Sequence, residues 1–318
     1  MKPPYKITAK VISLVALISE KIGAINAAHL NQPPTALRKK NRIKTIQSSL
    51  EIEGNTLSLK QITSILENKR VIGSKNEILE VKNAIKVYNQ IDKLNPYSLN
   101  SFCKAHFLLM DGLIASAGKL RSTSVGIMKG SEVAHIAPQG KMVKSLMNNL
   151  LEYLKNDDDL ILIKSCVFHY ELEFIHPFLD GNGRMGRLWQ TLILKEDYPI
   201  FKFLPVETVI KERQARYYEA LVVSVNSGES TPFIEFMLAV INDSLGELLK
   251  TTNVVLKNID RIEIYKKAIL KSYFTRKDYL RYFKEISSAT ASRDLKYAKE
   301  RGLLQKIGDK NNTKYKYV

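Results

Sequence analysis

Twelve residues near the middle of the chain constrain its fold and chemistry more than any other stretch. They read HPFLDGNGRMGR and run from His176 to Arg187. Apolar runs at 161–175 and 188–194 flank them, and the hydrophobic spacing of the first run predicts a buried helix. The sequence therefore predicts a polar loop between two apolar segments, with charged residues at the start of the second helix.

The residue types in this loop fit a nucleotide phosphate site. Glycines on both sides of Asn182 let backbone N–H groups point inward, and the N-terminus of the following helix adds positive potential. Arg184 and Arg187 lie three positions apart, so both guanidinium groups can face one anion. Asp180 is a hard oxygen ligand suited to Mg²⁺ beside a phosphate. His176 can accept a proton near neutral pH.

A structural network of the same side chains is the alternative. Buried arginines and a buried aspartate are costly unless a ligand or a partner requires them, which favours the functional interpretation.

The stretch matches the Fic (filamentation induced by cAMP) motif, HPFxDGNGRxxR, at every fixed position. The chain thus resembles Fic proteins, which typically transfer AMP from ATP to a Tyr, Thr or Ser hydroxyl of a target protein. The resemblance implies a mainly α fold, with a Fic-type helical bundle and a small β-hairpin flap. It also implies ATP as the substrate and Mg²⁺ as the metal.

Carried over by position, the resemblance assigns His176 to deprotonating the target hydroxyl and Asp180 to holding Mg²⁺. It places the outer phosphates on Arg184 and Arg187, with Arg187 nearest the γ-phosphate. The residues that would cradle the α- and β-phosphates are Gly181, Asn182 and Gly183. The reaction is an in-line displacement at the α-phosphorus, so positioning and cationic stabilisation should supply most of the catalysis.

A second segment, SLEIEG from Ser49 to Gly54, ends a predicted helix. Gly54 and Asn55 both tolerate a left-handed cap, which places Glu53 in the last turn, where the helix dipole disfavours a carboxylate. The segment resembles the Fic inhibitory motif, (S/T)xxxE(G/N). The resemblance implies that Glu53 pairs with Arg187 and blocks productive γ-phosphate binding, because a paired arginine cannot also bind the phosphate. A solvated helix-end glutamate is the alternative.

Short β-prone runs at 124–127 and 133–136 flank Lys129-Gly130-Ser131, which predicts a hairpin. The resemblance implies that this hairpin is a flap over the active site that pairs with the backbone of the target. The expected flap contacts are Val133, Ala134 and His135. A purely structural hairpin is the alternative.

A segment at 216–221 resembles the adenine-binding side of Fic proteins. Tyr217 and Tyr218 offer aromatic faces, and Asn226 offers an amide, which suits stacking and hydrogen bonding to a purine. Adjacent tyrosines cannot face the same way on a helix, so one of the two could belong to the core.

The last fifth of the chain is strongly basic. From Thr251 to Val318 there are 17 Lys and Arg against 7 Asp and Glu, a net charge of +10 out of the formal +17 of the whole chain. Such asymmetry predicts an acidic partner, with nucleic acid first. A merely solvated basic surface is the alternative.

The same segment predicts three helices, at 265–273, 276–283 and 288–301, and then strands at 303–307 and 313–318. This order is the winged-helix layout, with 288–295 as the recognition helix and Gly302 as its stop. The residues that could meet a major groove are Thr290, Ser292, Arg293 and Lys296. A protein-docking module is compatible with the same layout.

At 318 residues the chain is too long for one small core. We expect a helical region at 1–90 that carries the inhibitory helix, a catalytic core at 91–250 and a winged-helix domain at 255–318. No stretch is long and apolar enough to span a bilayer. Cys103 and Cys166 lie in apolar contexts that suit reduced core cysteines, so a cytoplasmic protein is expected. The oligomeric state is open, and a homodimer is one option.

Three functions are compatible with the sequence. The leading one is an adenylyltransferase inhibited by Glu53, whose target could be the chain itself. In the second, the same site removes AMP from a modified protein, with Glu53 orienting a water molecule. In the third, the chain is a DNA-binding regulator and the pocket senses a nucleotide.

Overall fold

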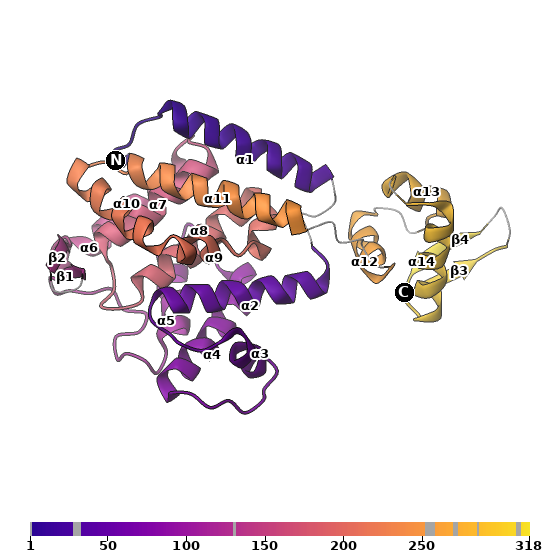
Figure 1. Cartoon of the computed structure of the whole chain (residues 1–318), viewed down its shortest axis with the longest axis horizontal. Helices are drawn as coiled ribbons and strands as arrows, with labels where there is room; N and C mark the ends of the chain where they lie inside the picture. The colour runs from indigo at the N-terminus through magenta and orange to yellow at the C-terminus, as the bar shows by residue number, and fades with distance from the viewer. Residues whose placement is uncertain are drawn as a thin grey trace. The chain divides into compact units, whose positions relative to one another are not determined.

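The computed structural model describes residues 2–27, 33–129, 132–251, 258–269, 273–284, 286–309 and 313–318 (Figure 1). The chain divides into two compact units. One comprises Met1–Asn31 and Arg38–Lys250, and the other comprises Gln32–Leu37 and Thr251–Val318. The expected regions 1–90 and 91–250 thus pack together in one unit, and the chain passes to the other unit close to the expected boundary.

The predicted mainly α fold is confirmed. The α-helices as far as residue 251 are α1 (Ala9–Ala27), α2 (Thr35–Ile52), α3 (Leu59–Leu66), α4 (Lys75–Asn89), α5 (Leu99–Met110), α6 (Val143–Asn156), α7 (Ile161–Ile175), α8 (Asn182–Asp197), α9 (Val206–Glu212), α10 (Gln214–Ser227) and α11 (Thr231–Thr251). Short 3-10 turns join some of them, at Ile91–Lys93, Gly140–Met142 and Pro199–Phe203.

Helices α7 and α8 form the centre of the first unit, and most of their residues are buried. Gly186 on α8 allows the two helices to pack closely, because a Cβ atom at this position would lie 2.6 Å from Cδ2 of His169 on α7. The His169 ring is buried, and its Nδ1 lies 2.8 Å from Oε1 of Gln190 on α8. The loop at 176–181 is therefore held at both ends by tightly packed helices.

Helix α1 packs along α11 (Figure 1). Thr8, just before α1, donates a hydrogen bond of 2.7 Å to Glu235, and Lys21, further along, donates one of 2.6 Å to Asn242. Ile18 and Ile25 of α1 are fully buried, while other apolar residues of the helix stay exposed. Within the described ranges, none of the helices has the length and apolar character needed to cross a membrane.

The predicted hairpin at the middle of the chain is confirmed. Strand β1 (Gly126–Lys129) pairs antiparallel with β2 (Glu132–Ile136), and a β-bulge interrupts the register after Ile127. The first strand begins two residues later than expected. The expected contact residues lie on β2, where Val133 pairs with Met128 and His135 with Ile127. The side chains of Val133, Ala134 and His135, and the turn at Gly130-Ser131, lie outside the described residues.

The second unit has the expected order of three helices and a hairpin. Its elements are α12 (Asn258–Ala268), α13 (Arg276–Tyr282), α14 (Ser288–Glu300), β3 (Leu304–Ile307) and β4 (Lys314–Tyr317), and the two strands pair antiparallel. Its own apolar core includes Tyr265, Phe274, Tyr279 and Leu295. Gly302 follows α14 with φ +69°, as expected for a helix stop. The winged-helix interpretation stays a prediction.

The expected bounds of the first helix in this unit were wrong. A helix was predicted at 265–273, whereas α12 begins at Asn258 and ends at Ala268. The reason is that Asp260 and Arg261 are 8% and 6% exposed, so charged side chains occupy inward positions of its first turn. Charges at such positions hide the apolar periodicity on which the prediction depended.

Candidate active site

The loop between α7 and α8 begins with a strained histidine. His176 follows the last residue of α7 in a left-handed conformation, with φ 50° and ψ 62°. Such a conformation costs a residue other than glycine about 1–3 kcal/mol, so surrounding contacts must enforce it. Two of them are visible. The His176 N–H donates to the Leu172 carbonyl at 2.9 Å, and its own carbonyl accepts from Arg121 Nε at 2.6 Å.

The loop is closed by hydrogen bonds between Asn182 and Phe178. The Asn182 Oδ1 accepts from the Phe178 N–H, and its Nδ2 donates to the Phe178 carbonyl, both at 2.9 Å. The asparagine is 2% exposed. Its amide group is therefore occupied in shaping the loop, and its backbone N–H is the part that remains to bind a phosphate.

His106 on α5 supports the loop from beneath. Its ring stacks on Phe178 with a centroid distance of 3.5 Å, and its Nε2 lies 2.9 Å from the Asp180 carbonyl. Nδ1 accepts a hydrogen bond from the Gly118 N–H, so Nε2 carries the proton and donates to Asp180. Burial lowers the pKa of His106 to about 4, which keeps the ring neutral at pH 7. The ring is fully buried.

The first turn of α8 presents backbone N–H groups that have no partner within the helix, which is the usual basis of an anion site. Arg184 lies in this turn and is 5% exposed. Its Nη1 pairs with Glu80 at 3.2 Å and its Nη2 with Asp180 at 3.1 Å. A buried guanidinium held between two partly exposed carboxylates remains available to an anion that replaces one of them.

Arg187 is paired with the end of α2. Its Nη2 donates to Glu53 Oε1 at 2.7 Å and to the Ser49 carbonyl at 3.0 Å, and its Nε donates to Ser49 Oγ at 3.1 Å. The Arg187 side chain is 1% exposed and the Glu53 side chain 26%. The two segments singled out in the sequence, 49–54 and 176–187, therefore meet in the structure.

The turn that carries Glu53 is a well-formed helix stop. Gly54 has φ +95°, the Asn55 N–H donates to the Leu50 carbonyl at 3.1 Å, and the Gly54 N–H donates to the Glu51 carbonyl at 3.0 Å. These are the two hydrogen bonds of a Schellman motif. Glu53 is thus held just beyond the helical residues of α2, at the edge of the site.

The Glu53 carboxylate also reaches the start of α8. A Cβ atom at Gly183 would lie 2.6 Å from Glu53 Oε1, so only a glycine leaves room for the carboxylate there. This is the helix turn at which a phosphate is expected. Glu53 therefore lies against the helix turn at which a phosphate is expected, as well as pairing with Arg187.

Two further carboxyl groups lie around Arg187. Burial raises the pKa of Glu173 to about 8 and the pKa of Glu207 to about 7, and in both cases the positive charge of Arg187 opposes the shift. Glu207 Oε1 lies 3.4 Å from the Tyr88 hydroxyl. Glu173 therefore keeps its proton through most of the neutral range, whereas Glu207 is about half protonated near pH 7.

The two tyrosines expected on the adenine side differ in placement. Tyr217 is 1% exposed, and its hydroxyl lies 3.1 Å from His169 Nε2, so it belongs to the core between α7 and α10. Tyr218 is 37% exposed, and Asn226 is also exposed. Of the pair, Tyr218 is the one with a face available to a ligand, and its role stays a prediction together with that of Asn226.

Asp180 has the chemistry of a magnesium ligand. Its Oδ1 accepts from the Gly181 N–H at 2.6 Å and from Arg184, while the described residues give its Oδ2 no hydrogen bond. The side chain is 54% exposed. Mg²⁺ is commonly held by one or two carboxylates together with substrate phosphates and water, so the exposed Asp180 carboxylate at the start of α8 fits the ion.

Arg121 is a site residue that the sequence analysis missed. It is 4% exposed and donates to the carbonyls of Ile175 and His176 at the end of α7, at 2.9 and 2.6 Å. It also donates to Thr123 before the hairpin at 2.6 Å and to Pro138 after it at 2.7 Å. One guanidinium therefore holds the start of the loop at 176–181 and the chain on both sides of the hairpin β1–β2.

The sequence around Arg121 does not predict these contacts, because their acceptors are backbone carbonyl groups, which every residue has. Glu80, the partner of Arg184, was missed because it lies 104 positions away on an amphipathic helix with other acids. Arg121 could have been noticed as a lone arginine between two breaks in the helical pattern, but its partners could not.

Three comparisons bear on this site. A model of the family described as Fic/DOC matches residues 96–194 of this chain. A crystal structure of a Fic family protein from Desulfovibrio desulfuricans G20 superposes with a TM-score of 0.77 at 39% identity, covering 100% of this chain and 98% of that one. The curated protein adenylyltransferase Fic of Culex quinquefasciatus is 31% identical over 69% of this chain and 44% of its own length. That of Nematostella vectensis is 30% identical over 74% and 55%. The chain spans about half the length of these curated relatives.

Proposed function

The chain belongs to the Fic/DOC family, and from that premise we propose that it transfers AMP from ATP to a hydroxyl group of a target protein, with Glu53 restraining the reaction. The observation that carries the proposal is the meeting of His176, the first turn of α8 and Arg187 around one loop. The curated relatives named protein adenylyltransferase support the same reaction.

His176 is the base in this proposal. It would accept the proton of the target hydroxyl while that oxygen forms a bond to the α-phosphorus and the bond to the pyrophosphate oxygen breaks. The Arg121 guanidinium and the Leu172 carbonyl fix the histidine backbone on both sides. A fixed base saves the entropy of orienting it in the transition state.

Charge builds on the departing pyrophosphate, and the site has three sources of positive potential to stabilise it. They are the N–H groups at the start of α8, Arg184 and Arg187. Both arginines are buried, where an ionic interaction is stronger than in water. Asp180 would hold Mg²⁺, which, when bound, would neutralise part of the phosphate charge.

Glu53 restrains the reaction in two ways within this proposal. It neutralises Arg187 by pairing with it, and it fills the place at Gly183 where the triphosphate would approach α8. ATP would then bind with its γ-phosphate displaced or would have to move Glu53 aside.

The hairpin β1–β2 is the proposed docking strand for the target, which could be the chain itself. Both of its strands belong to a two-stranded sheet within the described residues, so an extended target segment could add to an edge.

Cys103 and Cys166 form no disulfide in the structure, which supports the cytoplasmic location included in this proposal.

The test is incorporation of labelled AMP from ATP and Mg²⁺ by the wild-type protein and by Glu53→Gly and His176→Ala variants. We expect weak self-labelling by the wild type, an increase of about 5- to 150-fold in Glu53→Gly, and none in His176→Ala. Glu51→Gly is the matched control, because Glu51 lies on the same helix end but pairs with Lys211 at 2.7 Å.

Equal labelling by the wild type and Glu53→Gly, with ATP bound by both, would contradict the inhibitory role of Glu53. If no variant is labelled, release of AMP from a modified protein becomes the reaction to measure, with the same three proteins.

A further inference from the structure

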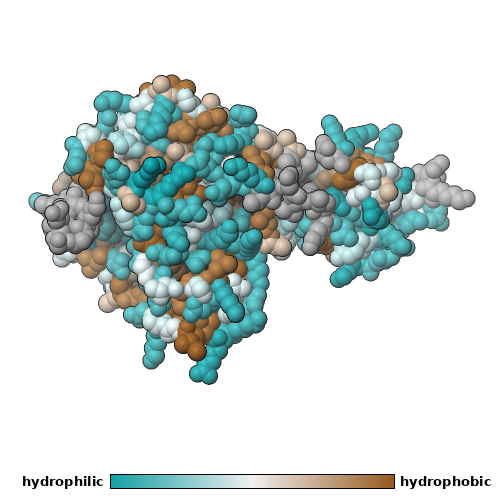
Figure 2. Space-filling model, in the orientation of Figure 1, coloured by the Kyte–Doolittle hydropathy of each residue, from teal (hydrophilic) through white to brown (hydrophobic). Residues whose placement is uncertain are grey.

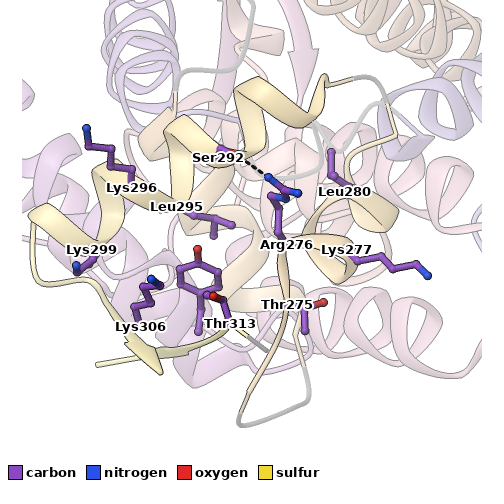
Figure 3. A pocket seen from close by; sticks show the side chains of 11 residues that line it. Thr275, Arg276, Lys277, Leu280, Ser292, Leu295, Lys296, Lys299, Lys306 and Thr313 are labelled. Atoms are coloured by element: carbon purple, nitrogen blue, oxygen red, sulfur yellow. Dashed lines mark hydrogen bonds between the residues drawn. The ribbon is translucent and has the colours of Figure 1, made fainter. Parts of the chain in front are cut away.

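The second unit carries a hollow of about 860 Å³ that is bounded by α13, α14 and the hairpin β3–β4 (Figure 3). The described residues that line it include five basic residues and no aspartate or glutamate. The basic residues are Arg276, Lys277, Lys296, Lys299 and Lys306. They come from three consecutive elements, α13, α14 and β3, and the fold brings their charges together around one hollow.

These cations are weakly compensated. Lys306 bonds Asp309 at 2.8 Å, but that aspartate is 88% exposed, and Lys296 is 3.9 Å from the exposed Glu300. The described residues provide no carboxylate within 4.0 Å of Lys277 or Lys299, or of Arg276. Exposed pairs are worth little, so an incoming anion meets most of the positive charge.

The floor and the rim of the hollow are largely polar. Arg276 donates to Ser292 Oγ at 2.9 Å, which holds its guanidinium between α13 and α14 (Figure 3). Thr275 and Thr313 also line the hollow, and Leu295 is buried at its base. Small-molecule pockets are lined mostly by apolar side chains, so this lining fits a hydrophilic polyanion better.

The arrangement of α13 and α14 in the second unit favours duplex DNA as this polyanion. Helix α14 follows α13 after a short connection, and Arg293, Lys296 and Lys299 are exposed along it. A second helix that follows a short turn commonly enters the major groove of DNA, while the first helix and the hairpin contact the backbone. The exposed side chains of α13, α14 and the hairpin are largely hydrophilic in the view of Figure 2.

We propose that this hollow binds the phosphate backbone of duplex DNA. The cations at the start of α13, along α14 and on β3 contact successive phosphates, and the N-terminal half of α14, with the half-buried Thr290 and the exposed Arg293, faces the bases. Phosphate contacts fix the position of the unit and carry no sequence information, so the hollow supplies affinity for any duplex. This inference is independent of AMP transfer, because none of its residues belongs to the loop at 176–187.

The test is binding of a short fluorescent DNA duplex to the full-length protein, measured by anisotropy between about 50 and 200 mM salt. The test variant is Lys277→Gln/Lys299→Gln, which removes two cations of the hollow. The matched control is Arg281→Gln/Lys284→Gln, which removes the same net charge from exposed positions of the same unit outside the lining. Thermal unfolding of all three proteins establishes that they are folded.

We expect the test variant to bind about tenfold or more weakly and to lower the slope of log affinity against log salt by about 2, because each lost phosphate contact removes close to one unit. The loss should be equal for duplexes of different sequence. The control should keep the wild-type slope.

Equal weakening in both variants would overturn the proposal, since net charge and not the hollow would then determine binding. Absence of duplex binding by the folded wild-type protein would also overturn it. So would equal affinity for inorganic polyphosphate, which would make the hollow a general anion site.

Discussion

Two buried arginines, one in each unit, are paired with carboxylates in different ways. Arg261 on α12 makes a two-point contact with Asp294 on α14, at 2.6 and 2.7 Å, and the Tyr279 hydroxyl adds a third bond at 3.2 Å. Arg187 on α8 makes a single carboxylate bond, to Glu53 at 2.7 Å. Asp294 is 1% exposed, whereas the side chain of Glu53 is 26% exposed.

This difference separates a permanent pair from a releasable one. Asp294 lies in the middle of a helix with both oxygens used, so it cannot leave without exposing a buried charge. Glu53 lies in a turn after a helix and can move into water, while Ser49 continues to bind Arg187. Four predictions follow from the contrast, in order of expected effect.

The largest effect should come from breaking the permanent pair. Asp294→Ala leaves the Arg261 guanidinium buried opposite an apolar side chain, and removal of one partner of a buried pair costs about 3–5 kcal/mol. We expect unfolding of the second unit at lower urea concentration, followed by circular dichroism. Asp309→Ala, which removes an 88% exposed partner of Lys306, should change stability by less than about 0.5 kcal/mol. A cost below that of the control would contradict the assignment of Asp294.

The second largest effect is expected in the pH dependence of the free energy of unfolding, through the buried carboxyl group of Glu207. Glu207 has its pKa raised by burial from 4.5 to about 7. Its stabilising effect is therefore complete below pH 4.5 and is lost as pH rises to about 7, because the unfolded carboxyl ionises first. The shift corresponds to a loss on the order of 3 kcal/mol.

Urea unfolding from pH 4 to pH 8 should show a loss that is smaller by this amount in Glu207→Gln, which cannot ionise, than in the wild type, because Glu173 contributes its own loss to both proteins. Parallel pH profiles for the two proteins would show that Glu207 does not titrate as proposed.

A change in the releasable pair, Glu53 and Arg187, should affect mainly the rate of AMP labelling. Glu53→Gln keeps the size of the side chain but removes its charge, so Arg187 becomes available while the space at Gly183 stays filled. We expect AMP labelling to rise about tenfold, equivalent to about 1.4 kcal/mol of coupling, with a stability change below about 1 kcal/mol. If Glu53→Gln labels as weakly as the wild type while Glu53→Gly is active, the side chain restrains the reaction by filling the space at Gly183 and not by its charge.

The smallest effect is expected at Ser49. Ser49→Ala removes the hydroxyl that accepts from Arg187 Nε and leaves the backbone carbonyl bond in place. The loss of one hydrogen bond, about 0.5–1.5 kcal/mol, should raise labelling about 2- to 10-fold. Ser48→Ala is the matched control, since the neighbouring hydroxyl contacts Thr208 at 3.2 Å. A larger rise in the control than in Ser49→Ala would show that the Ser49 hydroxyl does not help to restrain Arg187.

Much of the fold followed from local patterns. The left-handed stop at Gly54, the buried helices on either side of the loop and both hairpins are encoded in short stretches of sequence, and the structure has them. The contact between Glu53 and Arg187 spans 134 positions and was expected only through family resemblance. Physical reasoning on the sequence had no means of bringing those two segments together.

The rest depends on partners that carry no sequence signal. The amide of Asn182 is used by the Phe178 backbone, Tyr217 turns to His169, and Arg121 binds only carbonyl groups among its described partners. Residue type fixes how many hydrogen bonds such groups can make. Which groups they reach is determined by the packing of α7 against its neighbours.

Arg121 couples two events that would otherwise be separate. Its guanidinium binds the carbonyl of His176 and the chain on both sides of the hairpin. A target segment that moves the hairpin on docking would pull on the same group that fixes the histidine backbone. We therefore expect the protein to respond to how well a target fits, because a poorly seated strand would shift the base away from the hydroxyl before any bond to phosphorus could form.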